Sequence, residues 1–401
     1  MKKKILEWFI ILTTTIGAFL YFATIINSNS PTLDTDEVYW ISTARIVPIL
    51  LHRDFQNIFW HEHIGFVNFN GAKIIYGIGL TIFGHVDFSP AGIPPNTYYQ
   101  SKQFEGKPLS RNNPLFPLLY HARFISAVFA TASVLLMFII AKQVFQSIIP
   151  SLIVTVLFTM HSVFLRIAVH ALADSIFLFF ELASLLIFIL ILQELQMPKG
   201  SGKIKLYILL GLFLAYLTSI KINGVMFLFT YGAFIFSIYI EKLNVLKIKE
   251  FIRNSATVLC AFVTGFTVLH PNFFFYPSYS LLQMIKDRVY ITLYHRDYFL
   301  IIDPSHVSLT IPQRFFSLIH YSFYPIMTVF FIIGLGITIL RFIFIKHIKV
   351  NTIYQTMLVV GIITTFWLIS YVLFDEGRYF IPLLPFLVLI CGYPFSLIKI
   401  K

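Results

Sequence analysis

Apolar runs long enough for a membrane-spanning helix, about twenty residues, recur along this 401-residue chain and constrain its fold more than any other feature. Only structures that satisfy their own backbone hydrogen bonds can cross a bilayer. Hydrophobic residues make up 58% of the chain and charged residues 12%, which excludes an ordinary soluble globular protein. We therefore predict an all-α fold, a polytopic bundle of transmembrane helices embedded in a lipid bilayer.

The pattern predicts about ten transmembrane helices in a single domain, residues 1–401. The N-terminal apolar run follows three lysines and could also be a signal peptide. It is long for one, and no A-x-A cleavage site follows it, which favours a retained span. The predicted spans are 5–26, 122–145, 148–166, 171–193, 206–220, 223–240, 255–272, 321–343, 353–374 and 379–398.

Basic residues indicate how these spans are oriented. The formal net charge is +12, but the Lys and Arg residues flank apolar runs instead of forming one basic face, which argues against nucleic acid as a partner. The positive-inside tendency places the basic short loops and both termini in the cytoplasm. Two long loops, 27–121 and 271–320, are then expected outside, and the plasma membrane is the expected location.

The first outer loop carries helix-length apolar patterns at 38–51 and 72–83. Both are too short to span a bilayer, which is typical of helices that lie in the membrane interface. The segments 90–95 and 102–117 are rich in Gly, Pro and Asn and predict loop. We therefore expect interfacial helices on the outer face.

Ionisable residues gather near the predicted outer ends of the helices. Asp36 and Glu37 follow the first span, where acidic residues also favour a helix N-terminus. Arg123, Lys221 and Arg378 lie at the mouths of other spans, and each alone can be an interface anchor. Because charges near lipid are costly without a partner, their presence at one level predicts a shared site.

This mixture of charges suits one kind of chemistry. Cations hold a phosphate leaving group and stabilise the charge that it gains as a sugar–phosphate bond breaks. A carboxylate facing them can accept the proton of an acceptor hydroxyl as general base. A donor with a polyprenyl tail would need a groove between apolar helices.

Short motifs connect the sequence with a known family. The run Thr35-Asp36-Glu37-Val38-Tyr39-Trp40 resembles the aspartate–glutamate motif of protein O-mannosyltransferases and lipid A aminoarabinose transferases, which are GT-C glycosyltransferases. Similar motifs follow in the same order over nearly the whole chain. They are His121-Ala-Arg123-Phe-Ile-Ser-Ala127, His170-Ala-Leu-Ala-Asp174-Ser175, Thr218-Ser219-Ile220-Lys221-Ile222-Asn223-Gly224, His270-Pro271-Asn272 with Tyr276-Pro277, and Gly377-Arg378-Tyr379-Phe-Ile-Pro382-Leu-Leu-Pro385.

The resemblance implies a GT-C-like fold and a role for each candidate residue. Asp36 would be the catalytic base or would orient the acceptor, with Glu37 supporting it. Arg123, Lys221 and Arg378 would contact the donor phosphate or its neighbours. The implied partners are a polyprenyl- or dolichyl-phosphate sugar donor and an acceptor hydroxyl on a protein, lipid or glycan, with the active site on the outer face.

The sequence also departs from the family. The usual H-P-P-L before the second interfacial helix is missing, and Asn68-Phe69-Asn70-Gly71-Ala72-Lys73 stands there. Lys73 and Asp174 are kept as further site candidates. No cofactor is assigned; a divalent metal is left open, with His61, Glu62 and His63 as weak ligand candidates, although such a run is more typical of an exposed polar turn. Cys260 and Cys391 lie in apolar runs and are interpreted as buried hydrophobic residues.

Two other functions compete with the enzyme. A transporter or flippase for a lipid-linked glycan typically shows inverted repeats and charges at mid-membrane, whereas this sequence shows no repeat and carries its charges near the outer mouth. A scaffold without catalysis would not require Asp36, Arg123, Lys221 and Arg378 on one face. The sequence favours the glycosyltransferase.

Overall fold

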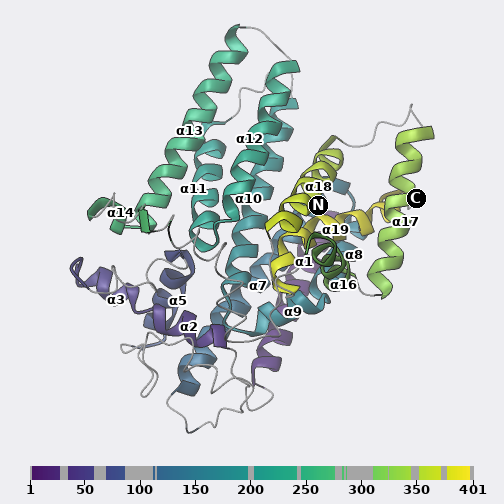
Figure 1. Cartoon of the computed structure of the whole chain (residues 1–401). Coiled ribbons are helices and arrows are strands. Elements are labelled where there is room, and N and C mark those ends of the chain that lie inside the picture. The colour runs from purple at the N-terminus through teal and green to yellow at the C-terminus, as the bar shows by residue number, and fades with distance from the viewer. Residues whose placement is uncertain are drawn as a thin grey trace.

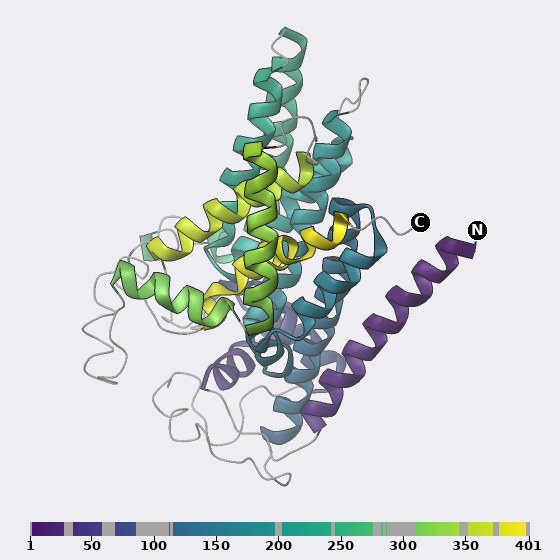
Figure 2. The ribbon, with the colours of Figure 1, turned by 90° about the vertical axis from the view of Figure 1, so that its right-hand side faces the viewer.

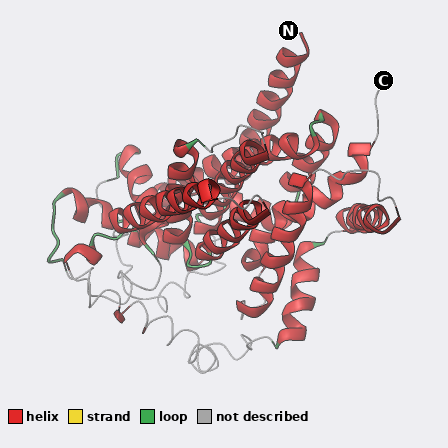
Figure 3. Ribbon diagram, turned by 90° about the horizontal axis from the view of Figure 1, so that it is seen from above, coloured by secondary structure: helices red, strands yellow, loops and turns green. Residues whose placement is uncertain are grey.

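The computed structural model is a bundle of helices (Figure 1). It describes residues 2–27, 35–57, 69–85, 115–196, 203–241, 245–275, 310–323, 325–344, 352–371 and 377–397, with a few isolated residues between them. No strand occurs within these ranges, as the view from above also shows (Figure 3). The predicted all-α class is confirmed.

The helices alternate with short connections in the described part of the chain. Their bounds are α1 (Lys2–Asn27), α2 (Thr35–Thr43), α3 (Ile46–Leu51), α5 (Asn70–Ile82), α7 (Leu115–Phe145), α8 (Ile148–Thr159), α9 (Ser162–Val169), α10 (Ala173–Gln196), α11 (Ile204–Ile220), α12 (Gly224–Glu241), α13 (Val245–Leu269), α14 (Asn272–Phe275), α16 (Ile311–Ser322), α17 (Pro325–Phe344), α18 (Thr352–Tyr371), η2 (Gly377–Leu383), α19 (Leu384–Gly392) and η3 (Tyr393–Leu397).

Length and composition identify the helices that can cross a membrane. Among the described residues, six segments qualify on their own: α1, α7, α10, α13, α18 and the run from η2 to η3. The count rises to as many as eight if the bent pairs α8–α9 and α16–α17 each form one span. The apolar helices α11 and α12 are shorter. The chain is therefore a multi-pass membrane protein, but the predicted number of ten spans is not established.

The structure departs from the predicted spans in three places. Residues 148–166 form two helices, α8 and α9, bent by 64° at a break that includes His161. Helix α7 begins at Leu115, inside the predicted first outer loop. Helix α16 begins at Ile311, inside the predicted second outer loop. Hydropathy averaged over a window does not detect a break of two residues or an amphipathic helix end.

The helices α2, α3 and α5 occupy the segments where short apolar helices were expected. A turn at Ala44 and Arg45 divides the expected helix 38–51 into α2 and α3. Figure 1 shows these three helices together in the lower part of the bundle, whereas α12 and α13 reach its upper end. In Figure 2, α1 runs along one flank of the bundle toward the same lower end. The charged residues of α2 therefore lie at one end of the bundle.

Close helix packing depends on small residues at specific positions. A Cβ atom at Gly211 of α11 would lie 2.4 Å from the backbone oxygen of Val258 in α13. Only glycine fits at that distance, and small residues are the usual means by which membrane helices approach closely. Apolar side chains from most of the helices join one continuous core around α7 and α10, which fixes the helix ends that carry the ionisable residues.

Candidate active site

Glu37, in the first turn of α2, forms a buried ion pair with Arg123 of α7. The Arg123 Nε donates to Glu37 Oε1 and Nη2 donates to Oε2, each at 2.7 Å. This two-point geometry is the strong form of an arginine–carboxylate contact. The backbone N–H of Ala171 donates a third hydrogen bond to Oε1 at 2.7 Å. Glu37 therefore joins α2 to α7 and to the segment between α9 and α10.

The surroundings of Glu37 keep it ionised. Burial would raise the pKa of its carboxyl, but the hydrogen bonds and charges of His170 and Arg123 outweigh burial and lower that pKa to about 2. The His170 Nδ1 atom lies 3.5 Å from Glu37 Oε1. A carboxylate that is enclosed and so weakly basic is a poor proton acceptor at neutral pH. Its geometry suits the supporting role that the family resemblance implied.

Asp36 differs from its neighbour because its carboxylate reaches the surface. The Asp36 side chain keeps 26% of its surface exposed, whereas that of Glu37 keeps none. Its partner is Arg378 of η2, whose Nη1 donates to Asp36 Oδ2. A small molecule can therefore reach Asp36 but not Glu37.

A third ion pair forms between Asp174 and Lys221. Asp174 stands in the first turn of α10, and Lys221 is the residue that ends α11. The Lys221 Nζ lies 2.5 Å from Asp174 Oδ1. The Asp174 side chain is buried, while the Lys221 side chain keeps 24% exposure. The cation of this pair is thus the more accessible member.

Tyr379 connects two of these pairs. Its ring centroid lies 5.4 Å from Lys221 Nζ and 5.4 Å from the guanidinium carbon of Arg378. Both distances are within the range of cation–π attraction. The aromatic ring therefore gathers two cations, each with its own carboxylate, into one charged cluster.

The three predicted phosphate-binding cations are not equivalent. Arg378 and Lys221 meet at Tyr379, and each has an exposed fraction of its side chain. Arg123 is 6% exposed and directs two of its nitrogens to Glu37. This geometry suits Arg123 to holding Glu37, and it leaves Lys221 and Arg378 as the accessible cations.

Lys73 lies in α5 and is fully buried. Burial lowers the pKa of its amine to about 7. Two residues earlier stands Gly71, where a Cβ atom would lie 2.8 Å from the backbone oxygen of Ser219. Ser219 in turn precedes Lys221 by two residues. Lys73 is therefore close to the same helix end as Lys221, but it is enclosed by protein.

Sequence reasoning missed several residues that shape the site. His170 and Tyr379 lie inside motifs already singled out, so their neighbours in sequence were the available signal. The Ala171 N–H is a backbone group, which no side-chain pattern can reveal. Tyr76 of α5 donates to the Leu172 carbonyl at 2.9 Å. In the sequence it is part of an apolar helical pattern and nothing distinguishes it from a core residue.

No metal site is evident in the described ranges. They contain no group of three or more His, Cys, Asp or Glu side chains arranged to hold an ion. His61, Glu62 and His63 lie outside the described residues. Of the cysteines, Cys391 is buried as predicted, but Cys260 is exposed on α13, so its interpretation as a buried residue was wrong. An apolar run does not tell which side of a membrane helix faces lipid.

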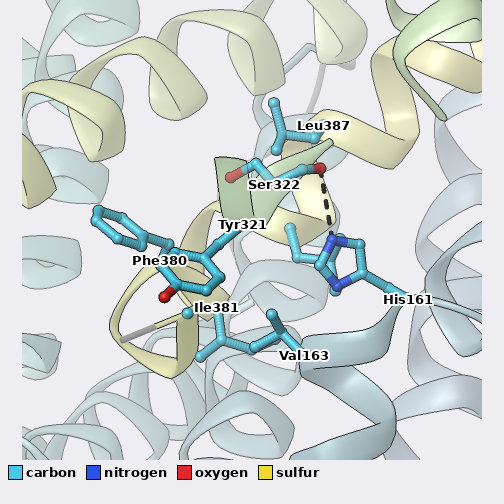
Figure 4. A pocket seen from close by; sticks show the side chains of 9 residues that line it. His161, Val163, Tyr321, Ser322, Phe380, Ile381 and Leu387 are labelled. Atoms are coloured by element: carbon cyan, nitrogen blue, oxygen red, sulfur yellow. Dashed lines mark hydrogen bonds between the residues drawn. The ribbon is translucent and has the colours of Figure 1, made fainter. Parts of the chain in front are cut away.

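A small pocket adjoins the segment that carries Arg378 (Figure 4). His161 enters it from the break between α8 and α9, with Nε2 3.4 Å from the Ser322 backbone oxygen. Gly377, which precedes Arg378 in η2, is also part of its wall. The lining residues are His161, Val163, Tyr321, Ser322, Gly377, Phe380, Ile381, Leu384 and Leu387. Most of this wall is apolar, in contrast to the charged cluster next to it in sequence.

Comparison with known proteins gives the chain a family context. Residues 95–282 match a family described as dolichyl-phosphate-mannose-protein mannosyltransferase. Arg123, Asp174 and Lys221 fall inside this match, and Asp36 and Arg378 fall outside it. No curated protein matches the sequence significantly.

Among solved structures, the chain is similar to the S. cerevisiae protein O-mannosyltransferase Pmt1-Pmt2 complex bound to the sugar donor, with a TM-score of 0.44 and 16% sequence identity. The similarity covers 68% of this chain, and this chain spans 34% of that relative's length. The family match covers a little under half of this chain, and the described part of the chain forms a bundle with several helices long and apolar enough to cross a membrane.

Proposed function

We propose that this chain is a membrane glycosyltransferase that moves a sugar from a polyprenyl-phosphate donor to an acceptor hydroxyl. One arrangement carries the proposal: the accessible carboxylate of Asp36 is paired with Arg378, which meets Lys221 at the Tyr379 ring. One cluster therefore supplies a base for the acceptor hydroxyl and two cations for the donor phosphate. These are the groups that sugar transfer from a phosphate requires.

The proposed reaction is a single displacement at the anomeric carbon of the donor sugar. The acceptor oxygen forms a bond to that carbon while the bond from the carbon to the donor phosphate oxygen breaks. The acceptor proton passes to Asp36, and the electron pair of the broken bond stays with the phosphate, giving polyprenyl phosphate. Arg378 and Lys221 stabilise the negative charge that the phosphate gains.

The ion pair of Asp36 with Arg378 determines the order of donor binding and proton transfer in this mechanism. The Arg378 nitrogen that donates to Asp36 cannot serve a donor phosphate in the same way at the same time. A phosphate that takes over Arg378 removes this hydrogen bond from Asp36, and a carboxylate that loses a bond from a cation becomes the stronger base. Donor binding therefore prepares Asp36 to receive the acceptor proton.

The supporting residues have separate tasks in this scheme. Glu37 and Arg123 hold α2 against α7 by their buried pair. Asp174 holds Lys221 at the end of α11.

The donor class and the side of the membrane belong to the same proposal. The matching family is described by dolichyl-phosphate-mannose as donor and by protein as acceptor, so we take a polyprenyl-phosphate mannose as the first donor to test. Protein, lipid and glycan hydroxyls are all kept as acceptors. The positive-inside tendency puts α2 and the cluster on the outer face of the plasma membrane.

Transfer by purified protein in liposomes tests the function. The donors are synthetic polyprenyl-phosphate sugars, beginning with mannose, and the acceptors are a Ser/Thr-rich peptide, lipids and glycans. We expect an acceptor-dependent release of polyprenyl phosphate that Arg378→Ala greatly reduces. The matched control is Arg341→Ala, since Arg341 also lies beside a tyrosine ring, Tyr393, but at the far end of α17 from the site.

Two results would contradict the proposal. Folded protein that releases polyprenyl phosphate from no donor, whatever the acceptor, would exclude the transferase. Movement of an intact lipid-linked sugar between leaflets without release of polyprenyl phosphate would instead identify a flippase. A dithionite-quenching assay with a fluorescent donor distinguishes this second result from the first.

A further inference from the structure

Residues 170–172 form a short connector between α9 and α10, which binds Glu37 through its backbone and leads into the turn that carries Asp174. The Ala171 N–H donates to Glu37 at 2.7 Å. Two residues after the connector, Asp174 holds Lys221 at 2.5 Å from the first turn of α10. The position of this connector therefore sets the spacing between the Glu37 pair and the Asp174 pair.

Tyr76 of α5 makes a second hydrogen bond to the connector. Its hydroxyl donates to the Leu172 backbone oxygen at 2.9 Å and lies 2.6 Å from Ser126 Oγ. Because the single phenolic proton is directed to Leu172, Ser126 donates to the Tyr76 oxygen. Ser126 stands one helical turn after Arg123 on α7. The chain of hydrogen bonds thus runs from α7 through α5 to the connector, and Tyr76 is fully buried.

Helix α5 itself has little freedom to move. A Cβ atom at Gly77 would lie 2.5 Å from the Ala44 backbone oxygen and 2.4 Å from Val47 Cγ2, so α5 lies directly against α3 and the turn that follows α2. Helix α5 also contacts α2 itself. At its other end, Gly71 approaches Ser219 near the end of α11. The helix that presents Tyr76 therefore contacts the elements that carry Asp36 and Lys221.

From these contacts we infer that Tyr76 is a positioning residue for sugar transfer, which holds the connector 170–172 so that the Glu37 and Asp174 pairs keep their spacing. This inference rests on the proposed function. The Tyr76 hydroxyl bonds a backbone carbonyl and a serine, so its role is to place other groups. It has no part in the proton transfer assigned to Asp36.

Replacing Tyr76 by Phe isolates the hydroxyl. The variant keeps the ring that fills the buried space. The Leu172 carbonyl then keeps the weaker hydrogen bond from Ser175 Oγ at 3.1 Å. We expect a folded protein whose connector is held less tightly. Misplacement of catalytic groups by about 1 Å can cost about 100-fold in rate, so a small displacement of the connector is enough to reduce transfer.

The test measures kcat and KM of Tyr76→Phe for a polyprenyl-phosphate mannose, per folded molecule counted by size-exclusion chromatography. We expect kcat and kcat/KM to fall together by about tenfold or more, with the donor KM changed by less than about twofold, as for a group that acts only in the transition state. Hydrogen exchange should show a faster exchange of the Ala171 amide. Ser126→Ala keeps the Tyr76–Leu172 bond and should have a smaller effect on both measurements.

The matched control is Tyr207→Phe, because Tyr207 is also buried but lies in the first turn of α11, away from Lys221. An unchanged kcat and an unchanged exchange rate of the Ala171 amide in Tyr76→Phe would overturn the inference. So would a loss in Ser126→Ala as large as that in Tyr76→Phe. Wild-type protein that releases no polyprenyl phosphate refutes the proposed function, and the exchange rate then still decides whether Tyr76 holds the connector.

Discussion

Arg378 donates a hydrogen bond to Asp36, a residue 342 positions earlier in the chain. The bond joins α2, just after the first helix, to η2, which opens the last membrane segment. It brings the most accessible acid of the cluster to a cation that also lies beside Tyr379. The proposed base and the proposed phosphate ligand are therefore partners of one another.

This pairing predicts that loss of the acid strengthens donor binding. In Asp36→Asn, Arg378 no longer has to leave a carboxylate in order to bind phosphate. A partly exposed ion pair is worth about 1 kcal/mol or less, so the affinity for polyprenyl phosphate should rise by up to about fivefold. Isothermal titration calorimetry with a short-chain polyprenyl phosphate in detergent measures it. Weaker binding by the variant would show that Asp36 helps to hold the donor.

The shape of the Arg378 side chain should matter as well as its charge. Arg378→Lys keeps the positive charge but loses the planar fork that contacts a carboxylate or phosphate at two points. We expect a rise in donor KM and a loss of transfer of about tenfold or more. The control is Arg341→Lys, because Arg341 donates to the Tyr393 hydroxyl at 3.0 Å outside the cluster. Equal activity of the two variants would remove Arg378 from the phosphate site.

The membrane bundle and most charged residues of the cluster could be predicted from the sequence for a clear physical reason. A membrane-spanning helix appears in the sequence as a long apolar run, and an ionisable residue at its end stands out against that run. Which charges pair could not be predicted, because the partner of Asp36 lies at the other end of the chain. The contact of Arg123 with Glu37 follows from burial that only packing determines.

Tyr76 and the Ala171 N–H show a second limit. A tyrosine on an apolar helix face is an ordinary core residue, and its hydroxyl finds a partner only in three dimensions. A backbone donor has no signature in sequence at all. The break at His161 was likewise hidden, because the segments on both sides of it are mostly apolar. Positioning groups are therefore harder to predict than the charges that they position.

The buried Glu37–Arg123 pair should dominate the acid stability of this end of the bundle. The pKa of Glu37 is lowered to about 2 from its ordinary value of 4.5. Its contribution to stability is therefore present above about pH 4.5 and is lost as the pH falls toward 2. Glu37→Gln should lose this contribution at neutral pH and should remove the Glu37 charge from the buried Arg123, at a cost of about 3 kcal/mol or more.

Thermal unfolding in detergent between pH 3 and pH 7 checks this prediction. Glu7→Gln is the matched control, because Glu7 pairs with Lys142 at 3.0 Å through side chains that keep 24% and 30% exposure. That substitution should change stability by less than about 1 kcal/mol. A Glu37→Gln variant as stable as the wild type at pH 7 would contradict the role assigned to the buried pair.

The pocket beside η2 should be sensitive to a single methyl group. In Gly377→Ala the new Cβ would lie 2.8 Å from Tyr321 Cδ1 and 2.8 Å from Val163 Cγ2, so the pocket wall must shift. Since Gly377 directly precedes Arg378, this shift should move that cation and raise the donor KM by about threefold or more. Gly336→Ala is the control, because a Cβ at Gly336 meets nothing within 4 Å. Kinetics with a polyprenyl-phosphate mannose measure the donor KM, and an unchanged KM would show that Arg378 keeps its position when the pocket wall shifts.

Transfer by Asp36→Asn tests most directly whether Asp36 is the base. Asparagine keeps the size of the side chain and caps a helix about as well as aspartate, but it cannot accept the acceptor proton. Asp54→Asn controls for loss of an acid in the same segment between α1 and α7, since Asp54 is exposed and accepts a hydrogen bond from Asn57 at 2.7 Å. We predict that Asp36→Asn is folded, binds polyprenyl phosphate and loses about 10²–10⁴-fold in kcat. Transfer within about twofold of the Asp54→Asn rate would contradict the mechanism, because an effect of general-base removal that small is outside the usual range.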